Sequence, residues 1–281
     1  MQNVYKMLLM LMPATRPRTK QKTLLFAKSG AEIPDWEEPV ERLVQALEQD
    51  EFELYAQRIV ALDKPKAAPM AEVLLRMRED AQGLLPPGSF LPVFERCGMM
   101  PELDRWVMRR AIARLARASR VPSLSLNISG QTLSDADFPP AVATELSRHR
   151  VPPASIGFEV LEEDALALPN SVEQFANAAR RIGCGLTIDG FGYSSVWLAP
   201  LRALKPNYVK VDRVVTRNLH SRTARGKLDR IVRAGKKLGV GVIGECVESD
   251  AVFATLRAAG AGFAQGYGIH VPGPINEALQ R

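Results

Sequence analysis

The sequence predicts a parallel α/β fold that closes into a barrel. Eight strand-like apolar segments alternate with helical segments over about 230 residues, a pattern typical of βα barrels. Several polar residues stand at the ends of apolar runs, where such barrels carry their functional side chains. An open, doubly wound sheet is the competing fold, and it calls for a glycine-rich turn after its first strand. None follows the first strand-like run at 52–62, so the closed barrel is favoured.

The individual elements follow from residue spacing. A helix is expected at 39–49, because its apolar residues recur about every three or four positions. The run at 52–62 alternates as a strand does, and a charged turn with Pro65 follows it. Further strands are expected at 70–75, 124–128, 156–161, 184–189, 207–212, 240–245 and 262–269. Helical stretches are expected at 90–118, 140–150, 172–182, 193–204, 222–238 and 251–259.

The net charge of +6 is concentrated at the amino terminus. Residues 1–31 contain six Lys or Arg residues and no acid, so the two charges balance over the rest of the chain. The high pI is therefore a property of this tail, and binding of a nucleic-acid polymer by the folded body is not expected. We expect residues 1–37 to form a flexible basic extension, with a contact to an anionic partner or membrane surface as the alternative.

Cysteine, histidine and hydropathy patterns exclude several classes of protein. Cys97, Cys184 and Cys246 lie far apart and form no zinc or redox spacing, so we expect reduced thiols and a cytoplasmic location. The three histidines lie in unrelated contexts and indicate neither a nucleophile triad nor a histidine zinc site. The apolar stretch at 7–12 is too short to span a bilayer, and no later segment approaches that length.

Seven polar residues stand in or at the ends of these apolar runs, and we expect them to face one mouth of the barrel. They are Glu72, Asn127, Glu159, Asp189, Lys210, Glu245 and Gln265. Their surroundings, in chain order, are AEVLLR, LSLNIS, GFEVLE, the stretch 189–192, YVKVD, GECVE and QGY. This ordered series resembles the EAL domain family, and the resemblance extends over residues 38–276.

The resemblance implies a modified (β/α)8 TIM barrel at 38–281 whose first strand runs antiparallel. It also implies a part in cyclic di-GMP signalling, because the family contains phosphodiesterases that open this bacterial second messenger to linear pGpG. Hydrolysis of a phosphodiester needs an activated water and neutralisation of phosphoryl charge, and Mg²⁺ or Mn²⁺ supplies both. Carboxylate and amide oxygens are the ligands that such hard cations favour.

The resemblance further assigns roles to single residues. It implies Glu72, Asn127, Glu159 and Asp189 as ligands of a first cation, and Asp189 with Glu245 as ligands of a second. Lys210 would act beside the attacking water as a base or an electrostatic anchor, and Glu245 and Gln265 would complete the catalytic group. Residues expected to contact the dinucleotide are Gln57, Leu74, Arg76, Asp212 and Glu248, with Arg76 suited to a phosphate. Glu162 is expected to brace the loop after Asp189.

The sequence departs from the family pattern directly after Asp189. The family motif has two aspartates in succession, and the second is Gly190 here, which has no side-chain oxygen. The Thr-Gly pair that follows in the family is missing before Tyr193, so the loop is shorter. Loss of a carboxylate that is shared between two cations should weaken the second cation most. The contacts expected for the nucleotide are better preserved than this second cation site.

Three functions stay open on the sequence alone. A degenerate EAL domain that binds cyclic di-GMP with little or no hydrolysis is favoured. The alternative is an active metal-dependent phosphodiesterase in which another ligand or a water replaces the missing aspartate. The third is a protein-interaction module that no longer binds the nucleotide. A protein partner or a homodimer is possible in each case.

Overall fold

The computed structural model describes residues 36–63, 70–79, 83–118, 123–192 and 198–280. Three sequence expectations fall on other residues: most of the flexible extension, the turn at Pro65, and the shortened loop that begins at Tyr193. They lie outside the described residues. The proposed domain boundary after residue 37 therefore stays a prediction.

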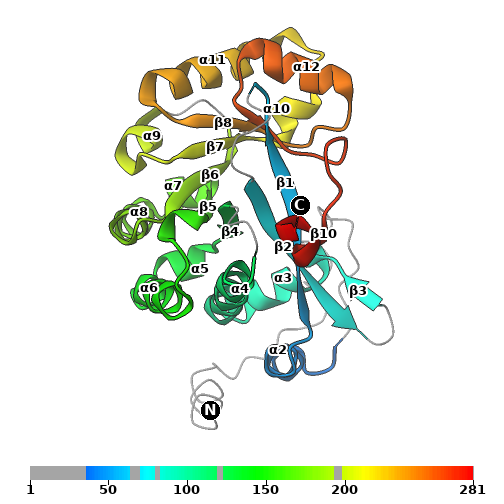
Figure 1. The fold of residues 1–281 in the computed structure, drawn as a ribbon, viewed down its shortest axis with the longest axis vertical. Helices are drawn as coiled ribbons and strands as arrows, with labels where there is room; N and C mark the ends of the chain where they lie inside the picture. Colours follow the sequence, from blue (N-terminus) through cyan, green and yellow to red (C-terminus); the bar gives the residue numbers. More distant parts are fainter. Residues whose placement is uncertain (1–35, 64–69, 80–82, 119–122, 193–197, 281) are drawn as a thin grey trace.

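Eight strands form a closed barrel, as the sequence predicts. Around the ring they are β1 (Phe52–Ala61), β9 (Phe263–Ala264), β8 (Gly241–Gly244), β7 (Tyr208–Val211), β6 (Gly185–Phe191), β5 (Ile156–Leu161), β4 (Ser123–Asn127) and β2 (Met70–Glu79). Pairing of β1 with β2 closes the ring. Figure 1 shows the strands around the centre of the molecule and the helices outside them.

The first strand runs against its neighbours, which confirms the expected modification of the barrel. β1 pairs antiparallel with β2 and with β9, whereas β2, β4 and the strands that follow pair in parallel. Two short strands that the sequence did not predict flank the ring. β3 (Gly83–Leu85) extends the edge at β2, and β10 (Gly273–Pro274) pairs with β1.

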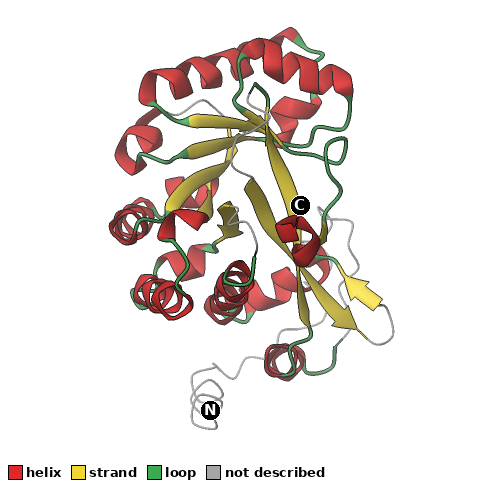
Figure 2. Cartoon of the chain, viewed as in Figure 1, coloured by secondary structure: helices red, strands yellow, loops and turns green. Residues whose placement is uncertain are grey.

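Helices cover the outside of the barrel, and Figure 2 shows them as a layer around the strands. Each has an amphipathic face, as the buried apolar residues of α8 illustrate. The larger helices are α2 (Pro39–Glu48), α3 (Pro87–Arg96), α4 (Met100–Leu115), α6 (Phe138–His149), α8 (Pro169–Ile182), α11 (Arg222–Leu238) and α12 (Asp250–Ala259). Shorter ones are α5 (Gly130–Leu133), α7 (Glu162–Ala167), α9 (Leu198–Leu204), α10 (Arg213–Arg217) and α13 (Ile275–Gln280).

Strand alternation decides which side chains enter the barrel. In β5, Phe158 and Val160 are buried beneath the helices, and Phe158 packs edge-on against Phe138 of α6 and Phe175 of α8. Glu159 between them must therefore face inward. The parallel register places Glu72 beside Ser125 and Asn127 beside Glu159, so inward residues of neighbouring strands form layers.

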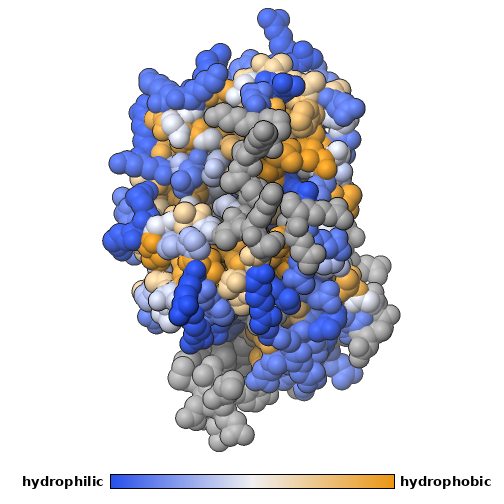
Figure 3. Space-filling view, viewed as in Figure 1, coloured by the Kyte–Doolittle hydropathy of each residue, from blue (hydrophilic) through white to orange (hydrophobic). Residues whose placement is uncertain are grey.

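Two strands differ from their expected lengths. β2 continues to Glu79, so Glu72 lies near its beginning and not at its end. The run at 262–269 contributes two residues to the ladder before the chain leaves the sheet. No described helix has both the length and the apolar character needed to cross a membrane. The basic residues of α11 are mostly exposed, and hydrophilic side chains cover the upper edge of the face in Figure 3.

Candidate functional site

A buried lysine lies at the centre of the site. Lys210 of β7 is 2% exposed, and its Nζ donates hydrogen bonds to Glu72 Oε2 at 2.8 Å and to Glu159 Oε2 at 2.9 Å. Asp189 Oδ1 lies 3.9 Å from the same nitrogen. These carboxylates come from β2, β5 and β6, so the barrel brings together residues that are far apart in the sequence.

Two amide side chains fix Glu72. Asn127 Nδ2 donates to Glu72 Oε1 at 2.9 Å, and Gln265 Nε2 donates to Glu72 Oε2 at 2.7 Å. Gln265 Nε2 also donates to Gln57 Oε1 at 3.0 Å, and Gln57 Nε2 donates to the His270 carbonyl at 2.9 Å. The predicted residues of β1, β2, β4, β5 and β7 are thus joined with Gln265, directly after β9, in one hydrogen-bonded group.

The two carboxyls that share Lys210 differ in acidity. Burial raises the pKa of Glu72, but the charge of Lys210 and the donors from Lys210, Asn127 and Gln265 outweigh burial, so its pKa is lowered. Burial raises the pKa of Glu159 to about 8, and the charges of Glu72 and Asp189 add to this against the attraction of Lys210. Glu159 has fewer donors, because its Oε1 is buried without a hydrogen-bond partner among the described residues.

Lys210 is held as a cation. Burial lowers the pKa of Lys210, but Glu159, Glu72, Asp189 and Glu245 together raise it well above the ordinary value. A general base must give up its proton near the working pH. Of the two roles expected for Lys210, the surroundings therefore favour the electrostatic anchor.

A cavity of about 490 Å³ opens beside this group. Asp189, Gly190, Asp212 and Glu245 line it together with the ends of β5 and α7. Burial and the nearby charge of Asp189 raise the pKa of Glu245 to about 7. The cavity therefore has an acidic wall that is rich in carboxylate oxygens.

Gly190 leaves a gap in this wall. Its φ of +67° lies in the left-handed region, and the pairing of β6 with β7 is irregular between Ile188 and Phe191. A Cβ atom at residue 190 would lie 3.8 Å from Asp212 Oδ2. A longer side chain at this position would enter the acidic wall.

The residues after Gly190 are braced as expected. Glu162 is buried, and both of its carboxylate oxygens accept a hydrogen bond from the backbone N–H of Gly192, at 3.3 and 3.2 Å. Lys227 of α11 donates to the Gly192 carbonyl at 2.8 Å. The start of the altered loop is thus tied to two helices.

The residues expected to contact a nucleotide divide into two groups. Leu74 and Arg76 alternate with Glu72 on β2, so they share its face. The guanidinium of Arg76 lies over the ring of Tyr55, 5.2 Å from its centroid. Asp212 and Glu248 lie elsewhere on the rim.

On that rim, Asp212 caps α10 by accepting from Val214 N at 2.7 Å. Glu248 is exposed and accepts from Arg217 Nη2 at 3.1 Å. The cavity is also lined by Arg213, Glu163 and Leu166, which no motif in the sequence marks. Their motif signal is weak, because single charged or apolar residues at helix starts are common on any surface.

The donor atoms fit a hard divalent cation in kind. Carboxylate and amide oxygens predominate, and Glu159 Oε1 is an oxygen with no other partner among the described residues. Within the same residues, no three Asp, Glu, His or Cys side chains are gathered closely enough to hold an ion as they stand. The Lys210 ammonium lies between Glu72 and Glu159 and shares their oxygens.

Comparison with known proteins agrees with this geometry. The sequence-family model of the EAL domain matches residues 40–272, so the chain belongs to the EAL domain family.

Curated relatives include cyclic di-GMP phosphodiesterase PdeB of Shewanella oneidensis, which is 29% identical over 91% of this chain and 30% of its own length. Cyclic di-GMP phosphodiesterase RocR of Pseudomonas aeruginosa is 29% identical over 94% of this chain and 67% of its own length. The chain spans about a third of the length of PdeB and of cyclic di-GMP phosphodiesterase PdeF of Escherichia coli, at 30% and 33%.

Solved structures share the fold. The FimX EAL domain from Pseudomonas aeruginosa bound to c-di-GMP has a TM-score of 0.77 and 29% identity, covering 84% of this chain and 96% of that one. The PaMucR phosphodiesterase in its c-di-GMP complex has a TM-score of 0.79 and 27% identity, covering 86% and 99%.

Proposed function

We propose that this chain binds cyclic di-GMP at the carboxyl end of its barrel and hydrolyses it slowly or not at all. The observation that carries the proposal is the gap at Gly190 beside an otherwise complete ring of polar side chains. Solved relatives that hold c-di-GMP share the fold over more than four fifths of this chain, at 84% and 86%.

The chain's own residues suit a cyclic dinucleotide. Arg76 offers a guanidinium to a phosphate, and Leu74 offers an apolar surface on the same face of β2. Gln57 and Gln265 are held in fixed orientations by their mutual hydrogen bond. Glu248 stands on the rim, where a base edge could accept or donate hydrogen bonds.

A divalent cation, Mg²⁺ or Mn²⁺, would be held by Glu72, Asn127, Glu159 and Asp189, and a second by Asp189 and Glu245. Such ions would supply charge neutralisation at the phosphate and an activated water. Lys210 keeps the inner carboxylates together while it remains protonated. At Gly190, the wall offers no carboxylate to the second ion, and this is why we expect little hydrolysis.

An active phosphodiesterase is the second candidate. The names of PdeB and RocR favour it, and so does Asp212, whose Oδ2 lies 3.8 Å from the Cβ position of residue 190. Asp212 could supply the missing oxygen. A protein-interaction module without nucleotide binding is the third candidate.

The cysteines at 97, 184 and 246 are free thiols, which supports the proposal of a cytoplasmic location.

Calorimetric titration with cyclic di-GMP in Mn²⁺, followed by chromatography for pGpG, tests the proposal. We expect micromolar or tighter binding, with pGpG formation far slower than ligand exchange. Asp189→Asn should weaken binding in Mn²⁺ at least about tenfold, and Asp229→Asn on exposed α11 should leave it unchanged. Rapid formation of pGpG would establish the active phosphodiesterase, and absence of binding would leave the interaction module.

A further inference from the structure

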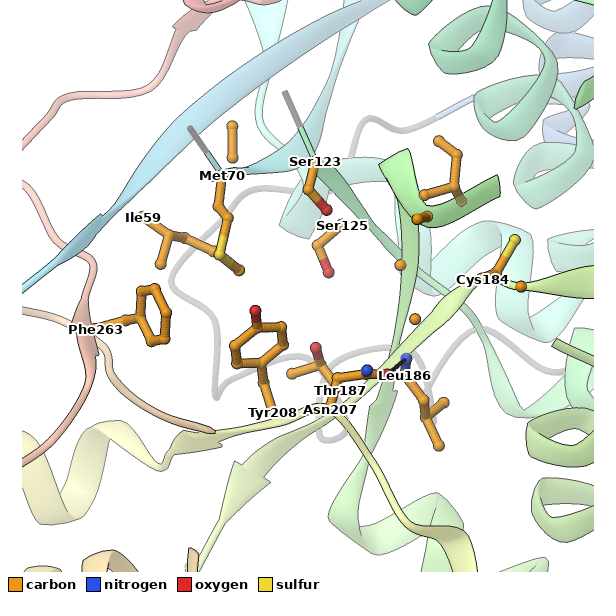
Figure 4. A pocket seen from close by; sticks show the side chains of 16 residues that line it. Ile59, Met70, Ser123, Ser125, Cys184, Leu186, Thr187, Asn207, Tyr208 and Phe263 are labelled. Atoms are coloured by element: carbon orange, nitrogen blue, oxygen red, sulfur yellow. Dashed lines mark hydrogen bonds between the residues drawn. The ribbon is translucent and has the colours of Figure 1, made fainter. Parts of the chain in front are cut away.

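A second cavity lies at the opposite, amino-terminal end of the barrel. It has a volume of about 310 Å³ and is lined by the first residues of the strands, among them Met70, Ser123 and Tyr208. Figure 4 shows these side chains around a common space. The inward residues here lie two positions before those of the candidate functional site. Ser125 precedes Asn127 in this way, and Tyr208 precedes Lys210.

Two neighbouring glycines leave this end of the barrel hollow. Gly157 of β5 and Gly185 of β6 are paired in register. Gly157 alternates with Glu159, and Gly185 alternates with Thr187 and Asp189, so both glycines face inward. Barrel interiors are usually filled by layers of branched side chains. Here a Cβ at Gly157 would come no closer than 3.8 Å to Ser125 Oγ. The missing side chains therefore leave open volume.

The opposite wall is rigid and aromatic. The ring of Tyr208 lies so close to Gly241 that a Cβ there would approach its Cδ1 to 2.5 Å. Phe263 packs edge-on against Tyr208, with ring centroids 5.4 Å apart. Ile59 and Met70 continue this wall in Figure 4. The cavity therefore has a fixed apolar side that an aromatic ring could contact.

A buried hydroxyl lacks a partner in the same cavity. Ser125 is 9% exposed, and its Oγ accepts or donates no hydrogen bond among the described residues. Figure 4 shows this oxygen and the Tyr208 hydroxyl directed into the space between them. An unpaired buried hydroxyl is unfavourable, and a ligand or water that pairs with it removes this penalty.

The lining is uncharged. None of the described residues around the cavity is Asp, Glu, Lys, Arg or His. Burial raises the pKa of Cys184 to about 12, so its thiol is neutral as well. A charged ligand would lose its hydration here without gaining an ion pair. The volume lies near the lower end of the range for small-molecule sites.

We propose that this cavity, which we call the basal cavity, binds an uncharged, hydroxylated ring molecule. The ring lies against Phe263, Tyr208 and Met70, and its hydroxyl pairs with Ser125 Oγ. Such a site is separate from the cyclic di-GMP site, because Asn127, Glu159 and Lys210 lie two positions further along their strands than the basal residues, and no residue lines both cavities. The basal cavity would bind its ligand whether or not the domain hydrolyses cyclic di-GMP.

Fluorine NMR with 4-fluorophenol tests the proposal on the full chain. We expect a saturable change in the probe signal, no such change with 4-fluorobenzoate, and no displacement by cyclic di-GMP. Absence of saturable binding by 4-fluorophenol would mean that the basal cavity holds only water, and it would overturn the proposal. Equal binding of the benzoate, or displacement by the dinucleotide, would overturn it too.

Two variants locate the probe. Gly157→Ala with Gly185→Ala should weaken binding at least tenfold by filling the cavity, since the nearest atoms to the new Cβ positions lie at ordinary contact distances of 3.5–3.9 Å. Gly226→Ala on the exposed face of α11, with nothing within 4 Å, is the matched control. Ser125→Ala should weaken binding by removing the hydroxyl, and it decides the matter if the double variant fails to fold. Unchanged affinity in the folded variants would contradict the assignment.

Discussion

A single ammonium group organises the inner site. Lys210 Nζ bonds two carboxylates from β2 and β5 at 2.8 and 2.9 Å, in a position that is 2% exposed. Removing one partner from a buried ion pair leaves an uncompensated charge, and this is far costlier than losing a surface pair. Lys210 is therefore important for stability as well as for the chemistry of the site.

Replacing this lysine should be strongly destabilising. We expect Lys210→Met to lower the free energy of unfolding by about 3–5 kcal/mol in metal-free buffer, because the Glu72 carboxylate loses its cation and Glu159 loses a hydrogen-bond donor. Urea denaturation at neutral pH measures the change. Lys237→Met on α11, where the side chain is exposed, is the matched control and should stay within about 0.5 kcal/mol of the wild type. A loss below about 1 kcal/mol for Lys210→Met would contradict the assigned role.

At the scale of elements, another buried carboxyl ties α4 to the turn after β4. Asp104 Oδ2 accepts hydrogen bonds from Ser129 N at 3.0 Å, from Ser129 Oγ at 2.8 Å and from Thr132 Oγ1 at 2.6 Å. Ser129 caps α5 and follows Asn127 closely. This contact positions the turn that carries Asn127.

Asp104 should make stability depend on pH. Burial raises the pKa of Asp104 above 3.8, against the hydrogen bonds from Thr132 and Ser129. The stabilising contribution of protonated Asp104 is complete at pH values below the pKa of Asp104 in the unfolded chain. It is lost as the pH rises through the pKa of Asp104 in the folded protein. The stability of the wild type relative to Asp104→Asn should therefore fall as the pH rises above about 4. Thermal unfolding measures this, with Asp229→Asn as control. A relative stability that rises with pH would contradict the account.

There are physical reasons why some elements could not be predicted from the sequence. β3 and β10 are three and two residues long, too short to show alternation. The run at 262–269 looked like a full strand, but it continues into Gly266. A Cβ at Gly266 would lie 2.1 Å from Val247 N, so the backbone packs directly against residues 247 and 248 and leaves the ladder. Local pattern carries no information about such a close approach.

On the scale of the whole molecule, the barrel has a short seam between β1 and β9. β1 pairs with β2 over eight positions but with β9 over two, Val60 with Ala264 and Ala61 with Phe263. The Gln265–Gln57 hydrogen bond and the bond from Leu62 N to Gly262 O add to this seam. Regions with few backbone pairs open locally at lower free energy than core strands.

Hydrogen exchange should detect this difference. Peptides that cover β9 should exchange at least about tenfold faster than peptides of β4, β5 and β6, since their local opening needs fewer broken bonds. Exchange in deuterated buffer followed by mass spectrometry measures both in one sample, so the inner strands serve as the control. Equal protection of the seam and the inner strands would contradict the topology-based account.

The sequence predicted the barrel and the residues that gather at its mouth, but it gave no basis for their pairing. Alternation and motif order place Glu72, Glu159 and Lys210 on inward faces. The choice of Lys210 as a shared cation depends on distances across the barrel. Likewise, the pairing of Glu248 with Arg217 joins two segments whose proximity only the closed fold determines.

The most direct test of the central claim compares single-turnover rates of pGpG formation in Mn²⁺. Gly190→Asp restores a carboxylate next to Asp212, and an aspartate tolerates the positive φ at this position better than most residues do. We predict a rate at least about tenfold above the wild type, with Gly190→Asn close to the wild type. A wild-type rate equal to or above that of Gly190→Asp would contradict the claim that the gap at Gly190 limits hydrolysis.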